Sequence, residues 1–237
     1  MKRIVAASLL ALALALTLVH SAKAQKDEQV VPVTSAPYHL PVFTNDYITL
    51  LNVYIPPGAR TSYHKHTGES VSINVEEGTM LNQNFGDPEP QPVLPQLKAG
   101  SVTYTDYRLK PRTHRAINAG TTPYHNIVFI FRSPQPSGFA PSSRVEVAAY
   151  EQVLDNNRAR GWRLKLDPGQ SVPAITQLAP GFRIIVKGGL VAESVPGLPD
   201  RPMNPRLGEF YWQDPGVTRS VRNIGTTPIE FLEFELK

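Results

Sequence analysis

The second half of this chain repeats the first half, and the repeat limits the architectures that the chain can adopt. Residues 57–58 (Pro-Gly) recur as residues 168–169, 111 positions later, and residues 118–123 (Asn-Ala-Gly-Thr-Thr-Pro) recur as residues 223–228 (Asn-Ile-Gly-Thr-Thr-Pro), 105 positions later. A duplication on this scale predicts two copies of one small structural module. We predict domains at residues 25–132 and 145–237, joined by a proline-rich linker at residues 133–144.

The first 24 residues resemble a secretory signal peptide. Lys2 and Arg3 precede an apolar run at residues 4–19, and Ala22-Lys23-Ala24 provides a cleavage site with small residues on either side. Because the run is shorter than the roughly 20 residues of a membrane span, we expect cleavage and a periplasmic or secreted protein. The alternative is that this segment stays uncleaved as an N-terminal membrane anchor. After it, no apolar stretch of the sequence is long enough to cross a membrane.

Charge and cysteine content narrow the possible partners and sources of stability. The 237-residue chain has 24 basic and 20 acidic residues, and loss of three basic residues with the signal leaves 21 against 20. A nearly neutral exported protein gives no reason to expect a nucleic-acid partner. Because the chain has no cysteine, it cannot form a disulfide, and we expect its stability to come from a packed core.

Short alternating segments predict an all-β protein. Prolines and glycines, 23 and 16 in number, separate runs in which apolar and polar residues alternate. Val71, Ile73 and Val75 form one apolar face, and the matching positions 182, 184 and 186 are apolar as well. We expect this face of each strand to look inward. We consider a short helix only for residues 147–158.

Three histidines distinguish the first copy from the second. His64 and His66 lie two apart on a predicted strand, so their side chains point to the same side. With His114 they offer three imidazoles, which suit Zn, Cu, Fe or Ni and leave room for water or substrate. The second copy has isoleucine, glutamine and arginine at the matching positions 175, 177 and 219. We therefore predict one divalent ion (Fe, Mn, Ni, Cu or Zn), held by the first copy only.

The spacing of these residues resembles the two motifs of the cupin superfamily. The first family motif is Gly, five residues, His-x-His, three or four residues, Glu, six residues, Gly, and the second ends in His, three residues, Asn. The matching positions are Gly58, His64, His66 and Gly78 for the first motif, and Gly100, His114 and Asn118 for the second, with about three extra residues before His114. The second copy keeps Gly208, Gly216 and Asn223. The resemblance covers nearly all of the chain after residue 24. It implies a bicupin, with two tandem double-stranded β-helix barrels of the jelly-roll type and a metal inside the first.

One departure from the family pattern concerns the acidic ligand. The family spacing places its glutamate at position 71, which is Val71 here, whereas Glu69 lies two residues earlier on the same side of the strand. Glu69 is therefore either a displaced fourth ligand or a loop carboxylate that does not reach the metal. A site with three histidines alone also resembles those of some thiol and diketone dioxygenases.

Further candidates surround the histidines. Tyr63, Tyr104 and Tyr107 lie on or beside the motifs, where a phenol can donate to substrate or simply pack at a barrel mouth. His125 is expected to face inward as a proton-transfer group or as a hydrogen-bonded residue at the rim. His39 receives no role. The basic residues around His114 favour a carboxylate-bearing ligand or form a solvated loop; they are Arg108, Lys110, Arg112 and Arg115.

These observations predict an exported, metal-dependent bicupin that acts on a small oxygenated organic molecule. The resemblance implies dioxygenase-like or decarboxylase-like chemistry, which is an analogy because one fold hosts many reactions. The alternative is a non-catalytic periplasmic protein that binds a small ligand or a metal, and a weaker one is a module that mainly builds an assembly. We expect a homodimer in either of the first two cases.

Overall fold

The computed structural model describes residues 29–94, 97–133 and 138–237, so the predicted signal peptide lies outside the described residues. Their regular structure is β-strand, apart from two 3-10 turns, η1 (Val33–Ser35) and η2 (Ser143–Glu146). No helix among the described residues is both long enough and apolar enough to span a membrane. The prediction of an all-β protein is confirmed.

The first barrel consists of two five-stranded sheets, in the orders β1-β4-β9-β6-β7 and β2-β3-β10-β5-β8. The strands are β1 (Val31–Pro32), β2 (His39–Thr44), β3 (Ile48–Ile55), β4 (His64–His66), β5 (Glu69–Asn74), β6 (Met80–Asn84), β7 (Gln91–Pro92), β8 (Val102–Asp106), β9 (Arg112–Asn118) and β10 (Tyr124–Phe131).

The second barrel repeats this arrangement in the sheets β11-β12-β19-β14-β17 and β13-β18-β15-β16. Its strands are β11 (Tyr150–Asp155), β12 (Ala159–Leu166), β13 (Ile175–Thr176), β14 (Gly181–Lys187), β15 (Val191–Ser194), β16 (Arg201–Met203), β17 (Phe210–Gln213), β18 (Thr218–Asn223) and β19 (Ile229–Leu236). The registers match as well, since Val71 pairs with Phe129 and the equivalent Phe182 pairs with Phe234. The sequence repeat is therefore a repeat of the fold, and the prediction of two tandem jelly-roll barrels is confirmed.

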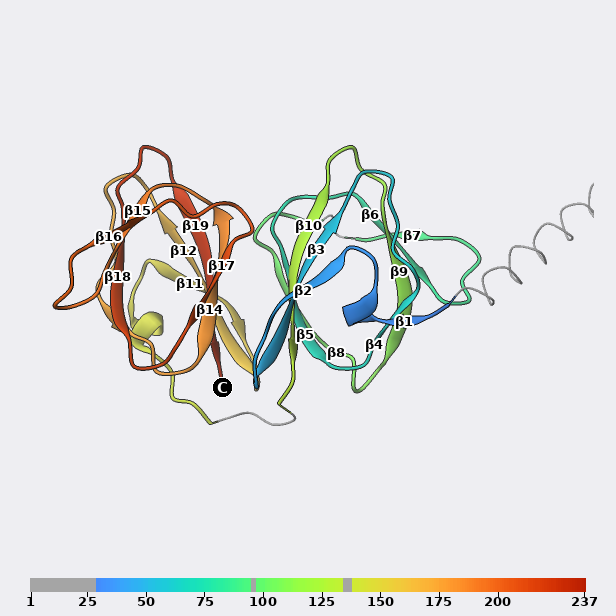
Figure 1. Cartoon of the computed structure of the whole chain (residues 1–237), viewed down its shortest axis with the longest axis horizontal. Helices are drawn as coiled ribbons and strands as arrows, with labels where there is room; N and C mark the ends of the chain where they lie inside the picture. Colours follow the sequence, from blue (N-terminus) through green and yellow to red (C-terminus); the bar gives the residue numbers. More distant parts are fainter. Residues whose placement is uncertain (1–28, 95–96, 134–137) are drawn as a thin grey trace, which may run out of the picture.

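The two barrels lie side by side and share one apolar core (Figure 1). Val71, Ile73 and Phe129 from the first barrel pack in the same cluster as Phe182 and Phe234 from the second, and all five are fully buried. The expectation that this apolar face looks into its own barrel is therefore wrong. It faces the other barrel, and the alternate residues of the same strands face the barrel interior.

The helix considered for residues 147–158 is also wrong. Residues 150–155 form β11, which pairs antiparallel with β12 and is the edge strand of its sheet. The corresponding segment of the first barrel is β2, paired with β3 in the same way. Tertiary pairing inherited with the repeat thus overrides the weak local helical pattern.

The repeated motif asparagine organises one turn in each barrel. Asn118 donates from Nδ2 to the carbonyls of Ile55 and Thr122, at 2.9 and 2.8 Å, and accepts from the Gly120 amide at 2.9 Å. Asn223 makes the equivalent three bonds in the second barrel. Both asparagines are fully buried. Because the second barrel keeps this pattern without histidine ligands, the motif asparagine serves the fold.

Candidate metal centre and its cavity

Strand pairing brings the three predicted histidines together. β4 lies antiparallel to β9 with His64 directly opposite His114, and His66 lies two residues further along β4 on the same side. One candidate ligand atom of each histidine lies within 4.8 Å of those of the other two. The cluster is the one set of at least three histidine, cysteine or acidic side chains in metal-binding proximity within the described part of the chain.

The orientation of the rings fits a bound ion. His66 Nε2 and His114 Nε2 lie 3.1 Å apart, and two nitrogens that share an ion at about 2.1 Å are roughly 3.0–3.4 Å apart for angles between 90° and 109°. His64 Nδ1 lies 3.0 Å from the Ser62 carbonyl, which accepts its proton and leaves Nε2 available. A backbone carbonyl that orients a ligand imidazole in this way is typical of metal sites.

The electrostatics of the cluster favour neutral imidazoles, the form that binds metals. Burial, together with the neighbouring His39, lowers the pKa of His64 to about 4. Burial also lowers the pKa of His66 to about 3, with His64 as the next cause. The pKa of His114 falls well below its ordinary value for the same reasons. All three rings are therefore unprotonated at neutral pH, with lone pairs available for a cation.

These lowered pKa values predict that acid destabilises the metal-free protein. Between the unfolded pKa of 6.5 and the folded pKa of about 4, His64 binds a proton in the unfolded chain and not in the folded one. The free energy of unfolding should fall by up to about 1.4 kcal/mol per pH unit for each such histidine as the pH drops through this window. Urea unfolding at pH 7 and pH 5 measures the slope. A double variant, His64→Gln with His66→Gln, should reduce it, and equal slopes in both proteins contradict the assignment.

The cluster lies in the wall of a cavity of about 750 Å³ inside the first barrel. Its apolar wall includes Val53, Ile55, Met80 and Val128. Its polar wall is formed by alternate residues of β5 and β8, by residues of β10 and by the loop before β8. The polar residues are Ser70, Ser72, Asn74, Ser101, Thr103, Thr105, Tyr124 and Asn126. This division follows from the orientation of the sheet, because the polar sides of β5 and β8 face inward.

Hydrogen bonds fix the polar wall before any ligand binds. Asn126 donates from Nδ2 to Ser72 Oγ and to Asn74 Oδ1, at 2.9 and 2.8 Å. Asn74 in turn donates to Ser101 Oγ at 2.7 Å and accepts from the Tyr124 hydroxyl at 2.9 Å. A network with most of its members satisfied holds its side chains in place. The wall therefore presents a fixed set of hydroxyl and amide groups.

The charged residues of the cavity are cationic. Arg112 and Lys98 line it, and none of the lining residues within the described ranges is acidic. Arg112 extends from β9 beside the histidines, where its Nε donates to Asn84 Oδ1 at 3.0 Å. The Tyr107 ring lies 4.7 Å from that of His66, measured between centroids. A bound metal ion would add further positive charge, so the cavity favours an anionic ligand.

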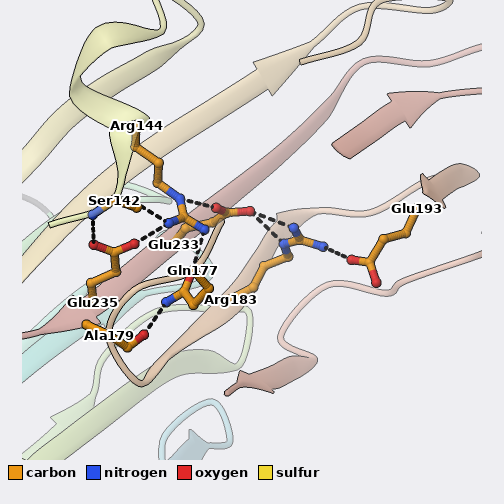
Figure 2. A network of polar contacts seen from close by, with 8 residues as sticks. All are labelled: Ser142, Arg144, Gln177, Ala179, Arg183, Glu193, Glu233 and Glu235. Carbon is orange, nitrogen blue, oxygen red and sulfur yellow. Dashed lines mark hydrogen bonds and ion pairs between the residues drawn. The ribbon is translucent and has the colours of Figure 1, made fainter. Parts of the chain in front are cut away.

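The corresponding interior of the second barrel is filled by an ion-pair network (Figure 2). Arg183 and Glu233, which match the cavity-lining Ser72 and Val128, form a pair with Nη2 and Oε1 2.7 Å apart. Arg144, within η2, reaches Glu233 at 2.7 Å and also pairs with Glu235. Gln177, which matches His66, accepts from Arg144 at 2.8 Å. In the second barrel, buried charged and polar side chains thus stand where the first barrel has the candidate ligand His66 and the cavity wall.

Comparisons with solved structures give the same architecture. AerE from Microcystis aeruginosa aligns with a TM-score of 0.53 at 15% identity, over 85% of this chain and 98% of that chain. The chain has a bicupin fold. Salicylate 1,2-dioxygenase from Pseudoaminobacter salicylatoxidans, crystallised with gentisate, aligns with a TM-score of 0.54 at 13% identity over 82% and 70%. A cupin 2 conserved barrel domain protein from Leptotrichia buccalis gives 0.51 at 9% identity over 84% and 88%.

Sequence comparison adds no family assignment to this similarity of fold. No protein-family model matches the chain, and the search of curated proteins found no match. At the identities of the aligned structures the similarity establishes the fold alone, so the function must be argued from the site.

Glu69 is not brought to the cluster of His64, His66 and His114. Its carboxylate accepts from the Tyr104 hydroxyl at 2.6 Å and pairs with Arg108 at 2.8 Å and with Arg158 of the second barrel at 3.3 Å. Glu69 shares the strand face of Val71, and this face packs toward the second barrel. Glu69 and Tyr104 therefore lie at the junction between the barrels. For this reason neither residue is part of the proposed site.

Tyr63 and His125 also lie away from the cavity lining. Tyr63 is fully buried, with its ring against Phe85 at 5.2 Å and the Arg115 guanidinium 4.8 Å from its centroid. His125 Nε2 lies 2.7 Å from Asn52 Oδ1, and its ring packs closely against Gly208 of the second barrel. The expectation that His125 points into its own barrel is wrong for the same reason as for Val71. Of the three tyrosines, Tyr107 is the one that lines the cavity.

His39 is the residue that the sequence interpretation missed. It is buried in the cavity wall, and its ring centroid lies 4.7 Å from that of His64. The repeat contained a signal for it, because position 39 aligns with Tyr150 at the offset of 111, so a histidine is lost there as well.

Proposed function

We propose that this bicupin is an exported, metal-dependent enzyme that acts on a small, oxygenated, anionic molecule at one site in its first barrel. The observation that carries the proposal is the convergence of three neutral histidines, His64, His66 and His114, on the wall of a large cavity. Three histidines satisfy half or more of a metal's coordination and leave positions for a substrate. The matching positions in the second barrel hold no such cluster among the described residues.

A divalent ion held by these histidines would supply Lewis-acid or oxygen-activating chemistry. The rest of the cavity would bind and orient the substrate. Arg112 offers a forked donor for a carboxylate, and the hydroxyl and amide groups of the polar wall offer partners for substrate oxygens. The apolar wall, including Val53 and Ile55, would cover the carbon skeleton and limit the access of water. This arrangement supports an organic acid, diketone or phenolic compound as the substrate.

The choice of dioxygenase or decarboxylase chemistry comes from similarity. Salicylate 1,2-dioxygenase, a structure with the same fold, is a dioxygenase by name and was crystallised with gentisate, an aromatic acid. The alternative function is a non-catalytic protein that captures a small ligand or a metal, and the second barrel supports it by keeping the fold without the histidines. Measurement of both oxygen consumption and carbon dioxide release during a screen of small acids and diketones distinguishes the two, because a dioxygenase consumes oxygen, a decarboxylase releases carbon dioxide and a binding protein does neither.

Export and assembly remain part of the proposal. The apolar N-terminal run and its cleavage site support a periplasmic or secreted location. N-terminal sequencing of the protein purified from its native compartment tests cleavage after Ala24. Light scattering of the same sample tests the expected homodimer.

Elemental analysis tests the metal site. Wild-type protein should contain about one equivalent of iron, manganese, nickel, copper or zinc, and the double variant His64→Ala, His66→Ala should contain almost none, because two of three ligands are gone. His125→Ala is the matched control, since it removes a first-barrel histidine outside the cavity and should leave the metal in place. Absence of metal from wild-type protein, even after reconstitution, would overturn the metalloenzyme proposal.

A further inference from the structure

His39 is a fourth histidine of the first cavity, beside the three candidate ligands. It is the first residue of β2 and is 8% exposed. It pairs with Val53 of β3, which lines the apolar wall of the same cavity. The His39 and His64 rings are tilted by 54° with centroids 4.7 Å apart. His39 therefore belongs to the cavity wall beside the histidine cluster.

The backbone before His39 is held in an unfavourable conformation. Tyr38 has a φ of 67°, the one positive φ of a non-glycine residue in the described part of the chain. A non-glycine residue adopts the left-handed region at an energetic cost, and it stays there where the surrounding structure enforces it. Here the Tyr38 carbonyl accepts from the Tyr54 amide at 3.0 Å, and the His39 amide donates to the Ala36 carbonyl at 3.1 Å. These bonds set the direction in which His39 enters the barrel.

The hydrogen bonding of His39 fixes the role of each ring nitrogen. Nδ1 lies 3.2 Å from the Pro37 carbonyl, which can only accept, so Nδ1 carries the proton and Nε2 has the lone pair. No hydrogen bond to Nε2 of His39 occurs among the described residues. Nδ1 is engaged with the Pro37 carbonyl, so Nε2 is the nitrogen that this ring, which lies beside His64 and lines the cavity, can offer as an acceptor.

The second barrel provides an internal comparison. Every cavity histidine of the first barrel is replaced there: the residues at the positions of His39, His64, His66 and His114 are Tyr150, Ile175, Gln177 and Arg219. Tyr150 lies beside the buried ion pairs, with the Arg144 guanidinium 5.7 Å from its ring centroid. A histidine at this position thus occurs in the barrel that has the three-histidine cluster and not in the barrel that lacks it.

We propose that His39 is a substrate-contacting residue, whose Nε2 accepts a hydrogen bond from a hydroxyl group of the molecule bound beside His64, His66 and His114. This inference rests on the proposed function, because the metal and Arg112 would hold the rest of that molecule. It narrows the substrate class to hydroxylated carboxylates.

Two probes that differ in their hydroxyl groups test the inference. Gentisate carries a carboxylate and two hydroxyls, and benzoate carries the carboxylate alone. Each is titrated calorimetrically into cobalt-loaded wild-type protein and into His39→Phe, which keeps an aromatic ring against His64 and removes the acceptor. His125→Phe is the matched control, because it makes the same change at a histidine outside the cavity.

We expect His39→Phe to keep its cobalt and its affinity for benzoate, and to bind gentisate about tenfold more weakly, since a hydroxyl is left without its acceptor. His125→Phe should behave as wild type. The inference is overturned if His39→Phe binds gentisate as wild type does, if it weakens both probes equally, if it loses cobalt, or if wild type does not prefer gentisate. Wild-type protein that binds no metal overturns the proposed function itself, so the two failures are distinguishable.

Discussion

Replacement of Glu233 by glutamine should lower the free energy of unfolding by about 3–5 kcal/mol, because it leaves buried guanidiniums without their shared counter-ion. Glu233 is 1% exposed and accepts from both Arg144 and Arg183 (Figure 2). Burial raises the pKa of Glu233, but the two guanidiniums outweigh burial and hold that pKa at about 2. The carboxylate is therefore charged in the folded protein at neutral pH, and its removal breaks a balanced network.

Chemical denaturation of wild type and Glu233→Gln at pH 7 measures this loss. Glu230→Gln is the control, since Glu230 pairs with Arg163 at 3.0 Å at a more exposed position and should contribute no more than about 1 kcal/mol. An equal effect of the two substitutions would contradict the importance assigned to the buried pairs.

The first barrel suggests how the network can be removed with less damage. The positions of Arg144, Arg183, Glu233 and Glu235 are occupied in the first barrel by Val33, Ser72, Val128 and Ile130. Transferring these four residues together removes both signs of charge, and Glu193, which loses its partner Arg183, is only partly buried. Since buried ion pairs are often replaceable by apolar residues at little cost, the fourfold variant should be more stable than Glu233→Gln. That result would mean that the ion-pair network fills the space of the lost cavity and is not required for the barrel to fold.

The sequence predicts the fold well because the fold depends on local patterns that occur twice. The turn residues around Asn118 recur around Asn223, and both asparagines make the same three hydrogen bonds. The histidine cluster is predictable for a similar reason. Two ligands lie on one strand, and the third follows the second motif at nearly the family spacing.

The sequence could not show which face of each strand points into the barrel and which points toward the neighbouring barrel. Alternation shows that Val71 and Ile73 share a face, but it does not show whether that face meets the barrel interior or another barrel. In this protein the apolar face is buried between barrels, and the polar face lines the cavity. The same ambiguity left the role of Glu69 open and placed His125 on the wrong side of its strand. For His39 the repeat shows only that a histidine is lost at the matching position 150, and the tertiary structure is needed to show that β2 meets the cluster.

The junction between the barrels leads to the second large expected effect. Phe129→Ala should lower the free energy of unfolding by about 3–5 kcal/mol, because it opens a cavity in a core that cannot easily collapse. The Phe129 ring is fully buried, with its centroid 4.5 Å from that of Phe182 and 5.3 Å from that of Phe234. Since those two partners belong to the second barrel, the lost contacts stabilise both barrels at once.

Tryptophan fluorescence can show this coupling, because both tryptophans, Trp162 and Trp212, belong to the second barrel. A substitution in the first barrel should therefore shift the urea midpoint of the fluorescence signal as much as that of circular dichroism. Val128→Ala, on the cavity side of the same strand, is the control and should have a smaller effect because Val128 is only partly buried. If Phe129→Ala shifts circular dichroism but leaves the fluorescence midpoint unchanged, the barrels unfold independently. Coincident shifts mean that the barrel without histidines contributes to the stability of the barrel that holds them.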